Sequence, residues 1–324
     1  MEQAADRVKA LVDEIGRVVI GQRALVEGLM LALLCDGHAL VEGVPGLAKT
    51  TAIRTLAQAL GLGFGRIQFT PDLLPGDLTG TPVYVPDERT FRVRRGPIFA
   101  PVLLADEINR APAKVQSALL EAMEEHQVTI GEESFPLPEP FFVMATQNPV
   151  ELEGTYPLPE AQIDRFLVKL VVPYPSLDDE RAIVDRDSAP AADVRPVADG
   201  EALVAMKRAA ADVHVAPAIV DYAVRIVRAT RDPAASDVRI EIPDARSPES
   251  FVALGASPRA SIYLVRAARA RALLDGRDYA TPHDVKRVAP DVLRHRVVAS
   301  YEAEADGVRP DRIVEAVLAT IETP

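Results

Sequence analysis

Residues 38–51 read HALVEGVPGLAKTT, and this stretch decides the fold. The apolar run at residues 39–41 leads into a glycine-containing turn that ends in the sequence KTT. Apolar side chains then recur at helical spacing over residues 52–60. The pattern predicts a strand, a phosphate-binding loop and a helix in succession, the arrangement of a P-loop.

Each part of this loop has a predicted role in binding a nucleotide. Gly43 and Gly46 allow sharp turns, so that successive N–H groups point at phosphate oxygens, and the helix N-terminus adds further donors. Lys49 is expected to reach the β- and γ-phosphates of ATP, and the Thr50 hydroxyl to ligate Mg²⁺. The predicted nucleotide-binding residues of the loop are Gly43, Val44, Pro45, Gly46, Leu47, Ala48, Lys49, Thr50 and Thr51.

Ala48 departs from the usual pattern G-x-x-x-x-G-K-[ST], because it stands where the second glycine is written. Alanine fits this position if its φ is helical, so we expect the departure to be minor. Taken alone, the motif is also compatible with an ordinary strand, turn and helix that carry a surface lysine.

The composition is that of an ordinary globular protein. The chain has 324 residues, enough for about two domains, and 48% of them are hydrophobic. A net charge of −12 opposes nucleic-acid binding, and the single cysteine excludes an intramolecular disulfide. No apolar run approaches the ~20 residues of a membrane span, and the N-terminus does not resemble a signal peptide. We expect a cytoplasmic protein.

A second candidate site element follows the P-loop by about sixty residues. Residues 102–105 form a continuous apolar run, typical of a buried parallel strand, and the run ends at Asp106 and Glu107. Ligands bind at the carboxyl ends of strands in open α/β sheets, so these carboxylates are expected to meet the P-loop. Asp106 suits a Mg²⁺-associated role, and Glu107 suits orienting and deprotonating an attacking water.

Four further candidates are weaker when taken singly. Asn148 follows the apolar strand at residues 141–145, and either approaches the γ-phosphate or is a turn residue before proline. Arg165 and Arg259 are cations available to stabilise transition-state charge, although such arginines are commonly surface ion-pair partners. The segment Ile20-Gly21-Gln22, with Gly21 and Gln22 as its named candidates, either lines an adenine pocket or forms a plain turn between helices.

Strand and helix signals alternate through the first part of the chain, which predicts a parallel sheet covered on both faces. Two β-hairpins are expected within it, at residues 83–93 and 127–137. Residues 185–200 are rich in Ala, Asp and Pro and form the best linker candidate, and helical patterns follow. We therefore expect an α/β nucleotide-binding core over residues 1–198 and a small all-α domain over residues 199–324.

Together these motifs resemble an AAA+ ATPase, and more narrowly the MoxR family. The narrower resemblance runs from about residue 21 to about residue 295. It is carried by the sequences GVPG (43–46), FTPDLLP (69–75), GPIFA (96–100), ADEINRA (105–111) and ATQNP (145–149).

The resemblance implies roles that spacing alone does not give. Asn148 would be sensor 1, Arg165 the arginine finger that reaches a neighbouring subunit's nucleotide, and Arg259 the sensor 2 residue on a helical lid. Family members resemble chaperones that remodel or mature other proteins, often with a partner bearing a von Willebrand factor A domain. Such a partner would here be a separate chain. The resemblance also implies a homo-oligomer, a hexamer.

We therefore expect Mg²⁺-dependent ATP hydrolysis that remodels a protein client. Two other classes remain open. A DNA-acting motor is disfavoured by the acidic balance and by the absence of an appended DNA-binding motif. A non-hydrolysing nucleotide-binding scaffold is disfavoured by the intact Lys49, Asp106 and Glu107.

Overall fold

The computed structural model describes residues 1–149, 154–187, 193–238 and 251–324. Residues 188–192 of the predicted linker lie outside the described residues. The division of the chain at residues 198 and 199 stays a prediction, because one hydrophobic cluster includes residues from both sides of it, such as Leu11 and Leu203.

A five-stranded parallel sheet forms the centre of the first part of the chain, in the order β2-β5-β8-β1-β9. The strands are β1 (Ala39–Glu42), β2 (Phe64–Gln68), β5 (Val102–Asp106), β8 (Phe142–Gln147) and β9 (Val168–Val171). The P-loop strand β1 lies between β8 and β9, and the strand that carries the acidic pair lies next to β8. The predicted α/β fold is confirmed.

Both faces of the sheet are covered, which explains the continuous apolar runs in its strands. Successive residues point to opposite faces: Leu104 packs into one hydrophobic cluster and Leu103 into the other. The first cluster contains α1 (Glu2–Gly16), α2 (Arg23–Leu34) and α3 (Lys49–Ala59), together with the C-terminal helices. The second contains α5 (Ala113–Glu125).

Short elements complete this part of the chain. They are the helices α4 (Pro75–Thr79), α6 (Glu160–Ile163) and α7 (Leu177–Asp187), and the 3₁₀ turns Pro97–Phe99 and Ile108–Arg110.

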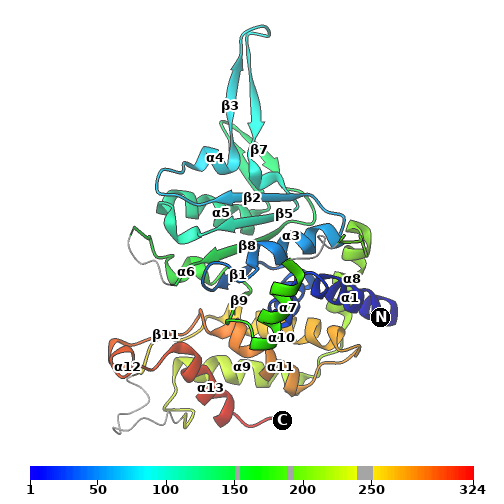
Figure 1. Ribbon diagram of the computed structural model, residues 1–324. Coiled ribbons are helices and arrows are strands. Elements are labelled where there is room, and N and C mark those ends of the chain that lie inside the picture. Colours follow the sequence, from blue (N-terminus) through cyan, green and yellow to red (C-terminus); the bar gives the residue numbers. More distant parts are fainter. Residues whose placement is uncertain (150–153, 188–192, 239–250) are drawn as a thin grey trace.

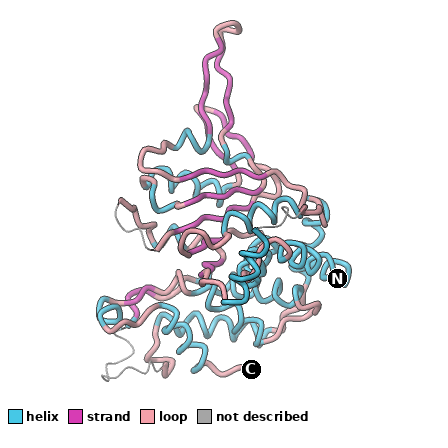
Figure 2. Tube along the Cα trace, in the orientation of Figure 1, coloured by secondary structure: helices cyan, strands magenta, loops and turns pink. Residues whose placement is uncertain are grey.

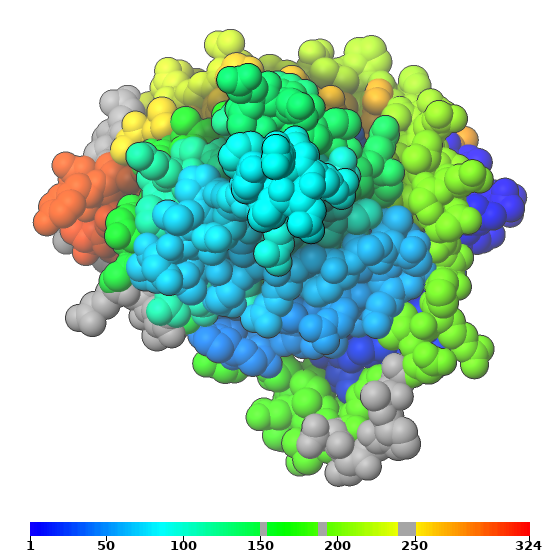
Figure 3. Space-filling view, turned by 90° about the horizontal axis from the view of Figure 1, so that it is seen from above, coloured from blue at the N-terminus to red at the C-terminus, as the bar shows by residue number. Residues whose placement is uncertain are grey.

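Both predicted hairpins are confirmed. Strands β3 (Gly80–Val85) and β4 (Thr90–Arg95) pair antiparallel, as do β6 (Gln127–Ile130) and β7 (Glu133–Pro136). The β3–β4 hairpin projects far from the body of the molecule, and Figure 2 shows that it continues in the direction away from the helical part. Seen from above in Figure 3, it stands in front of the sheet and its helices.

The C-terminal part is helical, as predicted, and lies on the opposite side of the sheet from the projecting hairpin (Figure 1). We call residues 200–238 and 251–324, which form these helices, a small two-stranded ribbon and their connections, the lid. The helices are α8 (Gly200–Asp212), α9 (Pro217–Arg231), α10 (Pro258–Leu274), α11 (Pro282–Leu293), α12 (Tyr301–Ala305) and α13 (Pro310–Thr320). The ribbon pairs β10 (Val252–Leu254) with β11 (Val298–Ala299).

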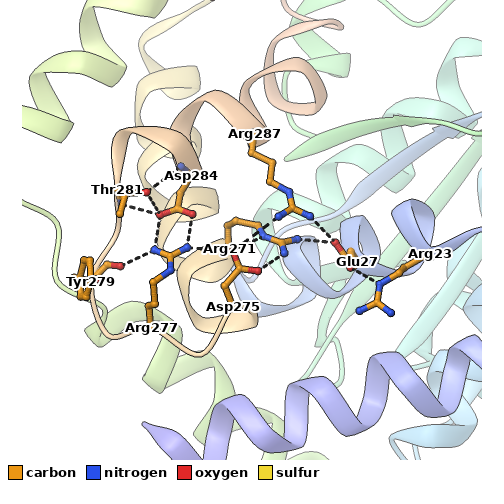
Figure 4. A network of polar contacts seen from close by, with 9 residues as sticks. All are labelled: Arg23, Glu27, Arg271, Asp275, Arg277, Tyr279, Thr281, Asp284 and Arg287. Atoms are coloured by element: carbon orange, nitrogen blue, oxygen red, sulfur yellow. Dashed lines mark hydrogen bonds and ion pairs between the residues drawn. The ribbon is translucent and has the colours of Figure 1, made fainter. Parts of the chain in front are cut away.

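A polar network ties the lid to α2 (Figure 4). Arg271 of α10 donates to Glu27 of α2 at 2.6 Å, and Arg287 of α11 reaches the same carboxylate at 3.3 Å. Burial raises the pKa of Glu27, but hydrogen bonds from Arg271 and Arg23 outweigh this and hold that pKa below its ordinary value. A paired carboxylate therefore links lid and core on one side of the molecule.

His38, just before β1, is a buried neutral side chain that joins three elements. Its Nδ1 accepts a hydrogen bond from Val143 N at 3.1 Å, so its Nε2 carries the proton and donates to Met123 O at 3.3 Å. Burial lowers the pKa of His38 from 6.5 to about 4. Protonation would place an N–H at Nδ1 against the N–H of Val143, which makes the charged form unfavourable in the folded protein.

The stability of the protein should therefore fall in mild acid. The unfolded chain takes up the His38 proton near pH 6.5 and the folded chain only near pH 4. The His38 contribution is complete above pH 6.5 and is lost as the pH falls toward 4, a decrease of about 3 kcal/mol in the free energy of unfolding.

Urea denaturation between pH 4 and 7 measures this loss. His38→Gln should reduce the pH dependence, with the part that comes from buried His295 remaining, while the matched change His283→Gln, at an exposed position, should leave it as in the parent. An unchanged pH slope in His38→Gln would contradict the assignment.

Candidate nucleotide-binding site

The P-loop has the predicted strand–loop–helix form. Strand β1 ends at Glu42, and α3 begins at Lys49. Gly46 has a φ of 86°, a conformation that L side chains rarely adopt. Gly43 is needed for a different reason: a Cβ there would lie 3.2 Å from the backbone oxygen of Val172.

The expectation of a helical φ at Ala48 is wrong. Its φ is 56° and its ψ is 17°, in the left-handed region. This conformation brings the Cβ of an L residue close to the following carbonyl and costs roughly 1–2 kcal/mol. Glycine is common at this position of P-loops because it avoids that strain. Alanine at position 48 therefore costs more than we expected from the sequence, although the loop retains the form of a P-loop.

Asp106 ends strand β5, and both of its carboxylate oxygens have partners. Oδ1 accepts from Thr146 Oγ1 at 2.6 Å, and Oδ2 accepts from Arg66 at 2.7 Å. The Thr146 hydroxyl oxygen in turn accepts from Glu107 N at 2.8 Å. Thr146 therefore links the two acidic residues and fixes the backbone between them.

Glu107 has a φ of 54°, again in the left-handed region, and its carboxylate is held from two sides. Oε2 accepts from Gln68 Nε2 at 2.7 Å and from Arg110 at 3.1 Å. Strain of this kind persists only where the surrounding contacts enforce it, and it is concentrated at functional sites.

Gln68 and Thr146 were not among the predicted site residues. Gln68 lies directly opposite Asp106 in the β2–β5 register, and Thr146 follows Ala145, which lies opposite Ala105 in the β5–β8 register. The available signal was the presence of polar residues at the ends of three predicted strands. Using it requires the strand order, which the sequence did not supply.

One cavity of about 1120 Å³ brings the P-loop, the acidic pair and Asn148 together. Its polar lining includes Lys49, Thr50, Thr51, Arg66, Gln68, Asp106, Glu107, Thr146 and Asn148, and the loop residues Pro45, Gly46, Leu47 and Ala48 also line it. Asn148 is 6% exposed, just beyond the end of β8. Lys49, Thr50, Asp106, Glu107 and Asn148, which the sequence predicted to act together, therefore meet in one place.

Lys49 lies at this cavity with its ammonium against the loop backbone. It donates to Val44 O at 3.2 Å and also to Gly43 O. Burial lowers the pKa of Lys49, whereas the carboxylates of Asp106 and Glu107 act in the opposite direction. Gly43 and Val44 thus contact Lys49 and do not line the cavity themselves.

Apolar side chains line another part of the same cavity. Val18 and Ile20 come from the connection between α1 and α2, and Ile183 and Val184 come from α7. This surface includes Ile20, the first residue of the segment predicted to line an adenine pocket.

Gly21 and Gln22 are placed outside the cavity lining. Gln22 is buried and donates to Pro173 O at 3.2 Å, and a Cβ on Gly21 would lie 2.8 Å from Asp179 Cβ. Their positions match the alternative interpretation, a turn between helices. Of the segment Ile20-Gly21-Gln22, only Ile20 is among the residues that line the cavity, where Val18 accompanies it.

Arg165 and Arg259 lie together, away from the P-loop cavity. Arg165 pairs with Glu124 at 2.9 Å, and Arg259 pairs with the same carboxylate at 3.1 Å. Both line a separate cavity of about 290 Å³, and neither is among the described residues that line the larger one. We expected these two cations to lie with the P-loop residues in one site. Within a single chain they do not.

Two kinds of feature are absent from the part of the chain that the structure describes. No helix there is long and apolar enough to cross a membrane, and no group of three or more His, Cys, Asp or Glu side chains is arranged to hold a metal ion.

Comparison with known proteins matches both parts of the chain. Residues 38–168 match the ATPase family associated with various cellular activities (AAA), and residues 245–317 match the AAA lid domain.

Similar full-length proteins are also known. The chain is 50% identical to the chaperone MoxR1 of Mycobacterium tuberculosis over 96% of this chain and 81% of that protein. It is 44% identical to YeaC of Bacillus subtilis, a protein described as uncharacterized, over 97% of this chain and 93% of that one. A crystal structure from Cytophaga hutchinsonii, of a protein assigned as an ATPase, superposes with a TM-score of 0.91 at 44% identity. The superposition covers 99% of this chain and 96% of the chain from Cytophaga hutchinsonii.

Proposed function

The chain belongs to the MoxR family of AAA+ ATPases, and from this we propose that it hydrolyses ATP with Mg²⁺ to remodel or mature client proteins. The proposal rests above all on one cavity. Lys49 and Thr50 of the P-loop line it together with Asp106 and Glu107 at the carboxyl end of β5.

The residues present suit ATP and Mg²⁺. The P-loop backbone and Lys49 would hold the phosphates, and the apolar side chains of Val18, Ile20 and Val184 would contact the base. The Thr50 hydroxyl and the Asp106 carboxylate are oxygen donors of the kind Mg²⁺ prefers. Two protein ligands are sufficient, because Mg²⁺ in such sites keeps waters and phosphate oxygens as its other ligands.

Glu107 is proposed to orient and deprotonate the attacking water. Bound ATP with Mg²⁺ supplies an electrophilic γ-phosphate and a neutralised leaving group. Gln68 and Arg110 hold one oxygen of the Glu107 carboxylate, at 2.7 Å and 3.1 Å. Asn148 lies at the end of the adjacent strand, where its amide would contact the γ-phosphate or the water. No covalent intermediate is required.

The positions of Arg165 and Arg259 support assembly into a ring of identical subunits, which we propose to be a hexamer. Both arginines lie outside the P-loop cavity of their own chain and share Glu124. Cations at that location would complete the site of a neighbouring subunit in a head-to-tail contact. Arg259 would then act on the neighbour, as Arg165 does, and not within its own chain.

We propose that the client is a protein, that a separate chain with a von Willebrand factor A domain assists, and that the work takes place in the cytoplasm. The relationship to a chaperone supports a protein client. The net charge of −12 counts against a DNA-acting motor. Magnesium-dependent phosphate release from ATP is the direct test of hydrolysis, and nucleotide binding without release would indicate a scaffold instead.

The projecting β3–β4 hairpin is the proposed client contact. Tyr84 and Phe91 are 50% and 67% exposed, and their ring centroids lie 5.3 Å apart. Exposed aromatic pairs are efficient anchors for protein contacts. The arginines nearby, Arg92 and Arg94 among them, leave two other outcomes to be tested: packing against a neighbouring subunit, or contact with nucleic-acid phosphates.

The double variant Tyr84→Ala/Phe91→Ala should keep normal oligomers and basal ATPase activity and lose stimulation by the client or partner. The measurements are the ATPase rate, the oligomer size and partner binding on the same preparation. Tyr301→Ala, at an exposed tyrosine of the lid, is the control. Loss of the oligomer would favour a packing role, and loss of DNA binding with an intact partner response would overturn the client assignment.

A further inference from the structure

The lid forms hydrogen bonds with the backbone of the segment that carries Arg165. Residues 164–167 connect α6 to β9, and Arg296 of the lid donates to three of their four carbonyl groups. The oxygens are those of Asp164 at 2.8 Å, Leu167 at 3.2 Å, and Phe166. Arg296 Nε also donates to the Asp164 carboxylate at 2.7 Å. One side chain thus holds the backbone on both sides of the predicted arginine finger.

His295 adds another hydrogen bond to the same segment. Its Nε2 lies 3.0 Å from Phe166 O, and burial lowers the pKa of His295 well below its ordinary value, so the neutral ring donates this hydrogen bond. Ser257, just before α10, adds a hydrogen bond from its hydroxyl to Asp164 Oδ2 at 3.0 Å.

Burying the charged side chain of Arg296 costs considerable free energy. Its side chain is 1% exposed, and its guanidinium also lies over the Tyr263 ring, 4.9 Å from the centroid. Burial lowers the pKa of Arg296 to about 10, with Asp164 acting in the opposite direction, so the group remains charged at neutral pH. A fully desolvated cation is a poor source of net stability, but its many fixed donors specify one geometry.

We propose that Arg296 is a positioning residue for Arg165, through which the lid sets where the arginine finger points. Arg296 contacts the residues that flank Arg165 and leaves the Arg165 side chain free to pair with Glu124 or to reach a neighbouring subunit. The lid also carries Arg259, which shares Glu124. The lid therefore contacts or carries both cations offered to the neighbour. This inference rests on the proposed role of Arg165 in a neighbouring site.

The test uses Arg296→Lys, which keeps the charge but cannot span the three carbonyls and the carboxylate. The protein should assemble and bind ATP with an unchanged KM, while kcat falls by about 100-fold, the loss expected from a misplacement of about 1 Å. Arg294→Lys is the matched control. Arg294 is the same residue type two positions earlier and also ties the lid to the core, but it does so at Lys169 O, at 3.1 Å, beyond the finger segment. It should retain the parent kcat.

Mixing separates positioning from a general loss of lid structure. Subunits with Arg296→Lys keep Glu107 and should regain turnover beside subunits with Glu107→Gln, which supply a well-placed Arg165. A parent-like kcat in Arg296→Lys, or a low kcat that mixing does not restore, would overturn the inference.

Two further results keep the test decisive. If Arg296→Lys does not fold, Asp164→Asn is used in its place. This change weakens the ion pair between Arg296 and the carboxylate and keeps the hydrogen bonds from Arg296 to the backbone. Parent activity in Asp164→Asn would overturn the inference. If Arg165→Ala is itself not restored by mixing with Glu107→Gln, the proposed role of Arg165 fails, a result distinct from failure at Arg296.

Discussion

Glu107→Gln should bind ATP as the parent does and lose about 10²- to 10⁴-fold in turnover, the usual contribution of a general base. The substitution keeps the size of the side chain and its ability to accept from Gln68 and Arg110, so the local structure should survive. What it removes is the carboxylate that we propose takes the proton of the attacking water.

Nucleotide binding and phosphate release, measured on the same samples, test this expectation. Lys49→Ala should weaken binding itself, which distinguishes a phosphate ligand from a base. Glu125→Gln, at an exposed position of α5, is the matched control and should behave like the parent. If Glu107→Gln hydrolyses ATP at the parent rate, another group activates the water.

Arg165→Ala should bind ATP and lose about 10³-fold or more in turnover, the range measured for arginine fingers. Arg165 lies with Glu124 and outside its own P-loop cavity, so its effect requires a second subunit. Specific activity of the parent should therefore rise with protein concentration until assembly is complete. Arg312→Ala, at an arginine whose side chain is 64% exposed, is the control.

Mixing two inactive variants gives the sharper result. Each subunit with Arg165→Ala retains Glu107, and each subunit with Glu107→Gln retains Arg165. In a head-to-tail ring formed from equal amounts, about a quarter of the interfaces should combine both intact groups and recover activity. Concentration-independent activity of a strictly monomeric species would exclude the arrangement in trans.

Much of the fold and part of the site were predictable because they depend on local patterns. The P-loop is encoded within fourteen consecutive residues, 38–51. The acidic pair directly follows the apolar run of β5, and the parallel sheet places the ends of its strands at one edge, so Asp106, Glu107 and Lys49 were expected to meet. Both hairpins also follow from short alternating runs that flank turn residues.

The tertiary structure alone decided the features that depend on residues distant in sequence. Gln68 reaches Glu107 across 39 positions only because β2 pairs with β5 in one register. The cavity wall combines Val18 with Val184 because α7 returns over the N-terminal connection. The left-handed φ of Ala48 is likewise a property of the folded loop and not of its residue types.

The sequence by itself determined that the chain has a P-loop, a neighbouring acidic strand end and a helical C-terminal part, because each is written in contiguous residues. Only the tertiary structure decided where Arg165 and Arg259 lie. Arg165 and Arg259 are 94 positions apart and meet at Glu124 because the lid docks there, held through Arg296 and Asp164. Docking of this kind depends on the shape and charge of whole surfaces, which no local pattern of residues records.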